Sequence, residues 1–149
     1  MAQPPASDDQ ALDGQSVEDL KFAPVENVIG FQLIARDNGR AVVLFTPTAR
    51  HVNPMGTLHG GILCDIADAA MNAAYLTTLQ DGETFTTLEM KINYLKPVWQ
   101  SQLRAHGWVV KAGRTIGLAE CDIYDEGGSL VARATSTCMT LRGEAAIGR

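Results

Sequence analysis

The sequence predicts an α+β fold in which an antiparallel sheet of about six strands wraps around one long central helix. One observation behind this is the apolar, proline-free segment 60–78, which is long enough for a helix and carries an acid near its middle. Another is the series of segments after it, which alternate between apolar and polar residues and are separated by glycine-containing turns. With 149 residues, 46% of them hydrophobic, the chain has room for one domain with one core.

The overall composition excludes several classes of protein. Charged residues make up 19% of the chain and the formal net charge is −5, which argues against a nucleic-acid binder and is ordinary for a soluble protein. No apolar stretch is long enough to span a membrane, so we expect no membrane partner. The cysteines Cys64, Cys121 and Cys138 are odd in number and form no CxxC pair, which predicts reduced thiols in a cytoplasmic protein.

The two ends of the chain differ from its middle. Residues 1–15 are rich in Pro, Ala, Ser, Asp and Gln without an apolar period, so we expect a disordered tail there. We expect one folded domain over residues 16–142 and a flexible tail over residues 143–149. Residues 16–19 have the N-cap and acidic first turn of a short helix, and we expect Pro24 to end that helix.

The remaining segments predict strands. Residues 29–36 and 41–47 should form a hairpin, because Asn38-Gly39 between them is a strong hairpin signal. After the helix, which Asp81-Gly82 closes, four further strands are expected, over residues 85–95, 102–111, 115–125 and 129–141. Alternation in the first of these four places Leu88, Met90, Ile92 and Tyr94 on one face of the pleat and Glu89, Lys91 and Asn93 on the other.

Strands joined by hairpins form an antiparallel sheet, and such a sheet wrapped around a long helix is the hotdog arrangement. One stripe of the helix suits the sheet, and it contains Ile62, Leu63, Ile66, Ala69, Ala70, Ala73 and Thr77. The opposite side lacks Lys, Glu and Arg, and it contains Gly61, Cys64, Asp68, Met71 and Tyr75. Because a helix that is apolar nearly all round is buried nearly all round, we expect a second subunit to cover this side.

Asp68 would then be partly shielded from water, where a carboxylate needs hydrogen-bond partners or has a raised pKa. Catalytic carboxylates are often prepared in this way, so Asp68 is the leading catalytic candidate. The alternative is a structural acid that bonds to a nearby backbone group or tyrosine. Asp65 ranks second, and His59 could be a general base, although a His at this position is more often a helix cap or a loop anchor.

Gly60 and Gly61 lie where the helix is expected to start, and there the backbone N–H groups and the helix dipole favour negative charge. They are therefore candidates for an oxyanion hole. Asp68 lies roughly 10 Å further along the axis, so a single carbonyl cannot contact both groups in one chain. If both act, they come from different subunits, and the active form is at least a dimer.

The pattern Asn53-x5-His59-Gly60-Gly61-x6-Asp68, followed by the segment Thr87-Leu88-Glu89-Met90-Lys91-Ile92-Asn93-Tyr94-Leu95-Lys96-Pro97, resembles the hotdog-fold acyl-CoA thioesterases. In particular it is similar to the PaaI-like branch of the 4-hydroxybenzoyl-CoA thioesterase superfamily. The resemblance covers residues 25–141, which is essentially the whole expected domain. HGG alone is a weak motif, whereas HGG with the spaced Asn, Asp and N-Y-L-K-P segment is a strong one.

The resemblance implies a hydrolase that converts an acyl-CoA and water to a free acid and coenzyme A, as a homodimer or a dimer of dimers. Asp68 would be the general base or nucleophile, and Gly61 or Gly60 would donate the backbone N–H that polarises the thioester. Asn53 and His59 would position the thioester, and Thr87 would orient water near the acid. No metal or organic cofactor is implied, because coenzyme A is part of the substrate.

The resemblance is less specific about how the substrate is held. Lys96, Lys111 and Arg114 are candidates for binding the CoA nucleotide. An apolar acyl pocket that favours an aryl or medium-chain group would be lined by Met55, Met71, Tyr75, Phe85 and Leu88. Neither the acyl group nor the choice between dimer and tetramer follows from the sequence.

Three other functions compete with hydrolysis. A hotdog hydratase or dehydratase would pair the acid with a His a few residues later on the helix, but the next His after Asp68 is His106. A non-catalytic acyl-CoA binder would not need the Asp, Gly, Asn and Thr together. Cys64 as a nucleophile has no base beside it that can be named.

Overall fold

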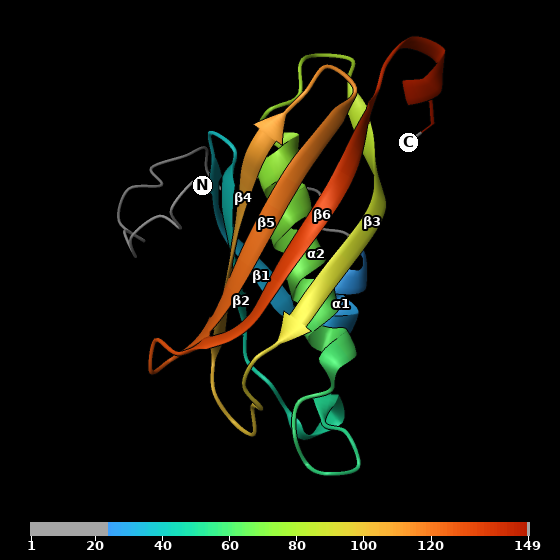
Figure 1. Ribbon diagram of the computed structural model, residues 1–149. Coiled ribbons are helices and arrows are strands. Elements are labelled where there is room, and N and C mark those ends of the chain that lie inside the picture. The colour runs from blue at the N-terminus through green and yellow to red at the C-terminus, as the bar shows by residue number, and fades with distance from the viewer. Residues whose placement is uncertain (1–23, 149) are drawn as a thin grey trace.

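The computed structural model describes residues 24–148 of the chain. The elements follow in the order α1 (Pro24–Ile29), β1 (Phe31–Asp37), β2 (Arg40–Phe45), the 3-10 helix η2 (Ala49–His51), α2 (Gly60–Leu76), β3 (Thr84–Tyr94), β4 (Leu103–Ala112), β5 (Ile116–Asp125), β6 (Leu130–Leu141) and the 3-10 helix η3 (Gly143–Ala146). The strands form one sheet around α2 (Figure 1). The predicted hotdog arrangement is therefore confirmed.

The sheet has the strand order β1-β2-β4-β5-β6-β3, and every neighbouring pair is antiparallel. β1 and β3 are its two edges within the described residues. The hairpin between β1 and β2 closes with Asn38 at φ 46° and Gly39 at φ 75°, the left-handed pair that a tight two-residue turn requires. Gly39 N–H also donates to Thr77 Oγ1 at 2.6 Å, which ties this hairpin to the end of α2.

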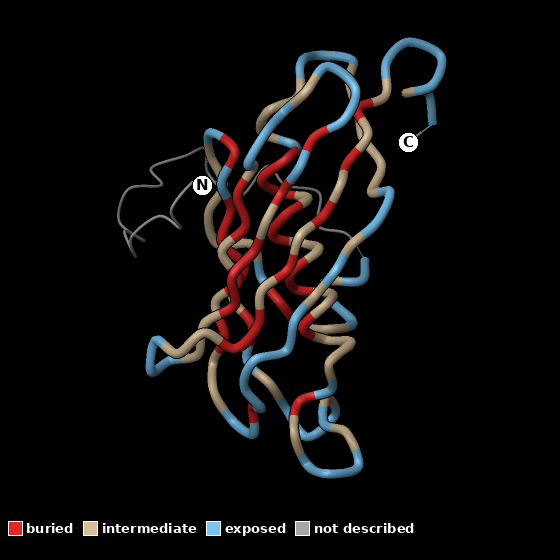
Figure 2. The backbone as a smooth tube through the Cα atoms, in the orientation of Figure 1, coloured by how far each residue is buried: buried red, intermediate tan, exposed pale blue. Residues whose placement is uncertain are grey.

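The helix lies against the concave face of the sheet. Buried residues lie on both the helix and the strands where the two are in contact (Figure 2). Strand β4 approaches α2 most closely at Gly107. A Cβ atom at Gly107 would lie only 2.4 Å from the carbonyl oxygen of Ala70. Only glycine fits at this point, because backbone packs on backbone there.

The face of α2 that meets the sheet differs from the predicted one. Its buried residues are Leu63, Ile66, Ala67, Ala70, Met71, Ala73, Ala74 and Tyr75. The prediction that Met71 and Tyr75 lie on the opposite side is wrong, because they are 0% and 1% exposed inside this chain. The Tyr75 hydroxyl bonds to Thr140 Oγ1 at 3.0 Å, and its ring packs against the tilted ring of Phe85 with the ring centroids 5.1 Å apart. The remaining side of α2, which includes Gly61, Cys64, Asp68 and Asn72, is only partly covered.

Strand β3 contains a bulge that simple alternation could not predict. Thr87 pairs with Cys138, but Glu89 pairs with the preceding residue of β6, Thr137, so Leu88 is an extra residue in β3. Leu88 is 51% exposed instead of lying with Met90 in the interior. The bulge also turns Thr87 toward α2, whereas unbroken alternation would place it on the outer face with Glu89.

Pro24 is the first residue of α1, a position that suits a residue with no N–H to donate and a fixed φ. The helix that Pro24 was predicted to end lies outside the described residues. The predicted tail over 1–15 and the predicted cap over 16–19 lie outside the described residues. In the expected C-terminal tail, η3 forms one short turn.

Replacing Gly107 with Ala should destabilise the protein strongly. The new methyl group would overlap the backbone of α2, so we expect the free energy of unfolding to fall by about 3 kcal/mol. Denaturant unfolding measures this change. Gly127→Ala is the control, because its Cβ would meet only a side-chain oxygen of Asp125 at 3.3 Å in an exposed turn. Equal stability of the two variants would contradict the close approach.

Candidate active site

The loop before α2 is organised by the side chain of Asn53. Asn53 Oδ1 accepts the backbone N–H groups of Met55 at 2.9 Å and Thr57 at 3.2 Å. Its Nδ2 donates to Thr57 Oγ1 at 2.7 Å. Both ends of the amide are therefore used inside the loop, and within this chain Asn53 acts as a loop anchor.

His59 caps the N-terminus of α2. Its Nδ1 accepts the backbone N–H of Gly61 at 3.0 Å, and its own backbone is extended at φ −66° and ψ 131°. The Gly61 N–H thus already has an acceptor. The backbone N–H of Gly60 has no acceptor among residues 24–148, and it sits at the positive end of the helix dipole. Of the two predicted glycines, Gly60 is therefore the one with an available donor.

Tyr94 is a neighbour of this helix start that the sequence analysis did not connect with it. Its hydroxyl donates to the Gly60 carbonyl at 3.1 Å and lies 3.1 Å from Cys64 Sγ. In the contact between Tyr94 and Cys64, either group can be the donor. This bond, assisted by burial, raises the pKa of Tyr94 to about 12. Tyr94 therefore stays neutral at physiological pH, and the group beside Cys64 is a phenol and not a base.

Asp68 lies on the partly covered side of α2. Burial raises its pKa above 3.8, and the nearby charge of Asp65 adds to the rise. A hydrogen bond from Asn72 Nδ2 to Asp68 Oδ2, at 2.8 Å, opposes the rise by stabilising the carboxylate. The pKa of Asp65 is also raised by burial. Asp68 is the better candidate of the two because it combines burial with a fixed polar partner.

Thr87 reaches this acid through Asn72. The Thr87 hydroxyl, which was predicted to orient water near the acid, donates to Asn72 Oδ1 at 3.3 Å. Asn72 was not among the predicted site residues. The only signal for it was its position four residues after Asp68, which places both on one side of the helix.

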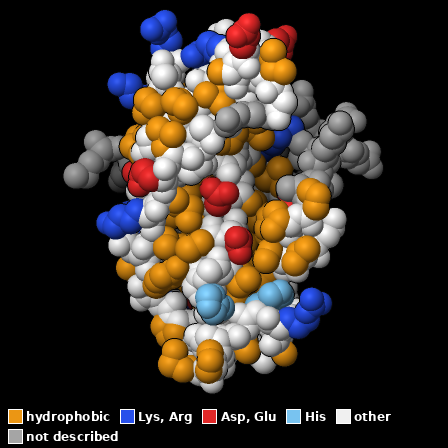
Figure 3. Space-filling view, turned by 90° about the vertical axis from the view of Figure 1, so that its right-hand side faces the viewer, with side chains coloured by type: hydrophobic (Ala, Val, Ile, Leu, Met, Phe, Trp, Pro, Cys, Tyr) orange, Lys and Arg blue, Asp and Glu red, His pale blue; other side chains and the backbone are white. Residues whose placement is uncertain are grey.

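The distance between the two halves of the site follows from the helix itself. Asp68 is eight residues after Gly60 in an unbroken helix, which is about 12 Å along the axis. In Figure 3, which views the molecule from the side of β3 and α1, acidic side chains lie between groups of hydrophobic ones on the open face. The acid and the amide donor are thus too far apart along one helix to hold the same carbonyl.

The other predicted substrate residues do not gather at this site. Lys96 pairs with Asp125 at 2.5 Å near one end of the sheet. Arg114 lies in the turn between β4 and β5, at the opposite end of the sheet. The exposed Leu88 lies on the edge strand, while Met71 and Tyr75 are in the core. One chain therefore does not assemble the predicted binding set.

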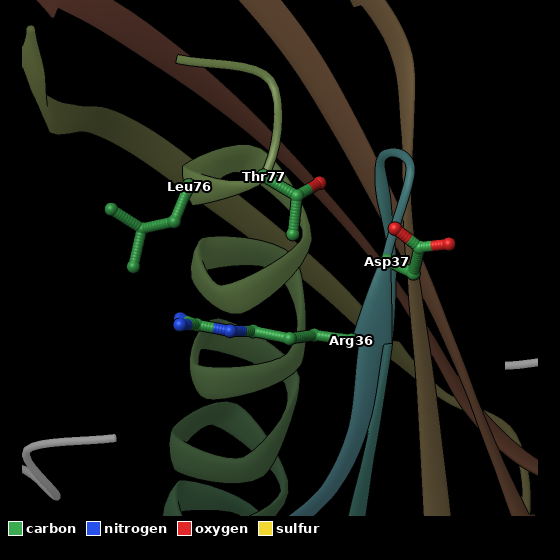
Figure 4. A pocket seen from close by; sticks show the side chains of 4 residues that line it. All are labelled: Arg36, Asp37, Leu76 and Thr77. Atoms are coloured by element: carbon green, nitrogen blue, oxygen red, sulfur yellow. The ribbon is translucent and has the colours of Figure 1, made fainter. Parts of the chain in front are cut away.

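Two hollows of about 410 Å³ each lie at the other end of α2. One is lined by Arg36, Asp37, Leu76 and Thr77, and Figure 4 shows the Arg36 side chain lying across the last turns of α2 while Asp37 points away from them. A cation in that place suits the negative end of the helix dipole. Neither hollow contains Asp68 or Gly60, so neither is the site of the candidate chemistry.

Residues 24–148 contain neither a metal-binding cluster nor a membrane-spanning helix. No group of three or more His, Cys, Asp or Glu side chains is arranged to hold a metal ion. None of the helices in that range combines the length and apolar character needed to cross a membrane.

An antiparallel sheet of six strands around one long helix defines a hotdog-fold protein. The family model of the thioesterase superfamily matches residues 55–132. Human acyl-coenzyme A thioesterase 13 is 28% identical over 117 residues, which are 75% of this chain and 81% of that protein. The 1,4-dihydroxy-2-naphthoyl-CoA hydrolase of Listeria monocytogenes is 26% identical over 102 residues, 68% of this chain and 83% of that protein.

Solved structures agree with these sequence relatives. The E. coli PaaI protein from the phenylacetic acid degradation operon superposes with a TM-score of 0.74 at 27% identity, covering 80% of this chain and 85% of that one. The chain belongs to the thioesterase superfamily, and it is a PaaI-like thioester hydrolase of the hotdog fold.

Replacing Asp68 with Asn should stabilise the folded protein at neutral pH. A carboxyl group whose pKa is raised in the folded state opposes folding when it is ionised, and this cost disappears below the pKa of the unfolded chain. We therefore expect a higher Tm for Asp68→Asn at pH 7, with the difference shrinking as the pH falls toward about 4. Thermal unfolding across this pH range measures it. A lower Tm for Asp68→Asn at pH 7 would contradict a desolvated carboxylate.

Proposed function

We propose that the protein hydrolyses acyl-CoA thioesters, releasing a carboxylic acid and coenzyme A, at a site shared by two subunits. The observation that carries the proposal is the position of Asp68: a desolvated carboxylate two turns from the Gly60 amide on the uncovered side of one helix. Its relatives support the substrate class, since their names include an acyl-CoA thioesterase and an aryl-CoA hydrolase.

In the proposed reaction, the thioester oxygen accepts the Gly60 N–H while negative charge develops on it. Asp68 either takes the proton of an attacking water or attacks the carbonyl itself. The C–S bond then breaks and the CoA sulfur leaves as a thiolate that is protonated from water. When Asp68 is the nucleophile, this step leaves a mixed anhydride between Asp68 and the acyl group, and water must cleave the anhydride to release the acid and restore the carboxylate. In a single turnover in H₂¹⁸O, an unlabelled acid identifies the anhydride route, because it arises only when water attacks the Asp68 carbonyl of the anhydride.

The proposed dimer follows from what one chain leaves uncovered. The far edge of β3 has no strand partner among the described residues, and Leu88 and Tyr94 on it are half exposed. The side of α2 that contains Asp68 and Asn72 is also only partly covered. A second copy that covers both would desolvate Asp68 further and bring its own Gly60 toward it.

The proposed acyl group is apolar, either aryl or medium-chain. Exposed apolar side chains lie near the start of α2 and along β3, and they include Met55 and Leu88. A charged acyl group would gain nothing from such walls. The preferred substrate can be identified by measuring the release of the CoA thiol from a panel of aryl- and alkyl-CoA esters.

Removing the carboxylate should abolish turnover without unfolding the protein. Because Asp68 is proposed to perform the bond-forming step, Asp68→Ala should lower kcat by about 10²–10⁴. Thiol release with the best CoA ester measures this loss. Turnover at the wild-type rate would remove Asp68 from the mechanism, and saturable CoA-ester binding by the wild type without thiol release would favour a non-catalytic binder. Hydration of an enoyl-CoA would favour a hydratase.

The Gly60 N–H can be deleted with a matched control. Gly60→Pro removes this donor at the first helical position, where proline is tolerated, and the extended backbone of His59 suits a residue before proline. Gly60→Ala keeps the donor, and its Cβ meets Tyr94 at the same 3.0 Å. We expect kcat to fall about 10²–10³-fold more in the proline variant. Equal kcat values would exclude this amide.

Mixed dimers test whether the site is shared. Asp68→Asn and Gly60→Pro chains each lack one half of the proposed site, so each homodimer should be inactive. Unfolding and refolding the two chains together should restore about one quarter of the wild-type rate, because half of the dimers are mixed and each has one intact site of two. A mixture as inactive as the parents would show that both groups act within one chain or that one is not used.

A further inference from the structure

A chain of side-chain hydrogen bonds links the edge strand β3 to the candidate acid on α2. The Thr87 hydroxyl donates to Asn72 Oδ1 at 3.3 Å, and Asn72 Nδ2 donates to Asp68 Oδ2 at 2.8 Å. An amide can make both bonds at once in only one orientation, because its oxygen accepts and its nitrogen donates. The Asp68 carboxylate, which can only accept, therefore holds the Nδ2 end of the Asn72 amide, and the Oδ1 end is left to accept the Thr87 hydroxyl.

The bulge in β3 makes this contact possible. The extra residue Leu88 reverses the alternation, so Thr87 faces α2 while Glu89 lies on the outer face and accepts the Thr137 hydroxyl at 2.7 Å. Bulges commonly re-aim a side chain beside a functional site. The bulge in β3 thus places the Thr87 hydroxyl within hydrogen-bond distance of Asn72.

We propose that Asn72 is a positioning residue of the thioesterase site and that Thr87 acts on Asp68 through Asn72, rather than by orienting water directly. This inference rests on the proposed function of Asp68. Asn72 occupies Oδ2 of the carboxylate and leaves Oδ1 to face the water or the thioester. It thereby fixes the rotation of the carboxylate about its last bond, which the covalent structure alone leaves broad.

Asn72 also controls the ionisation of the acid. The titratable groups that face Asp68 are the carboxylate of Asp65 on the same helix and the thiol of Cys138 on β6. Neither group is a cation that could stabilise the Asp68 carboxylate. Burial and Asp65 raise the pKa of Asp68, and the Asn72 bond lowers it. Without Asn72 the pKa of Asp68 should rise further, so the acid limb of the pH profile should move to higher pH.

A double-mutant cycle tests the route. Asn72→Ala should lower kcat about 10–100-fold with KM nearly unchanged, because Asn72 acts through Asp68 and does not touch the substrate. Thr87→Val should lower kcat to a smaller extent. In the Asn72→Ala background, Thr87→Val should have almost no further effect, since the residue through which it acts is gone. The acid limb of kcat/KM should shift upward in Asn72→Ala and shift no further in the double variant.

Conservative variants and a control accompany the cycle. Thr87→Ser keeps the hydroxyl and should restore most of the rate lost in Thr87→Val. Asn72→Asp keeps the shape but removes the donor, so it should be at least as slow as Asn72→Ala. Thr135→Val makes the same change on the outer face of β6, away from α2, and should leave kcat unchanged. Thermal unfolding and the mass in solution are compared for every variant.

Two results would overturn the inference. Independent, multiplicative losses of kcat in the double variant would mean that Thr87 acts directly on water. An unshifted acid limb in Asn72→Ala would mean that Asn72 has only a structural role. Failure of the proposed function is a different outcome, because Asp68→Ala would then turn over as fast as the wild type.

Discussion

The long helix α2 is more apolar than one sheet can cover, and this mismatch shapes the rest of the molecule. The sheet buries one side of the helix so closely that a glycine, Gly107, packs directly on its backbone. The other side of the helix must remain partly exposed to solvent or be covered by another chain. Asp68 lies at this boundary, where burial raises its pKa but no cation pairs with it among the described residues. A carboxylate that is partly buried without a cation lowers the stability of the fold, and a raised pKa of this kind is typical of functional carboxylates.

Much of the fold follows from short-range rules that the sequence displays directly. The Asn38-Gly39 turn, the strand segments and the start of α2 at Gly60 all depend on local backbone preferences, and the structure confirms them. The faces of α2 were harder to assign. Because apolar residues surround the helix, periodicity does not separate the side that meets the sheet from the side that is left open, and Met71 and Tyr75 were placed on the wrong side. Pro24 was read only as the end of a helix, and its place as the first residue of α1 was missed, although proline also starts helices.

The candidate site shows the same division. Asp68 and the glycines were recognised because an acid in an apolar helix and glycines at its start conflict with a simple core helix. Asn72 and Tyr94 were missed because their roles depend on contacts between α2 and β3 that no spacing along the chain encodes. Thr87 was assigned by resemblance, while its position in the structure depends on a bulge that strict alternation excludes.

The polar groups around the helix start can be understood together. His59 accepts the Gly61 N–H, and the Tyr94 hydroxyl donates to the Gly60 carbonyl and contacts the Cys64 thiol. The polar groups next to the Gly60 N–H are therefore hydrogen-bonded. The Gly60 N–H itself remains available as a donor at the positive end of the helix dipole.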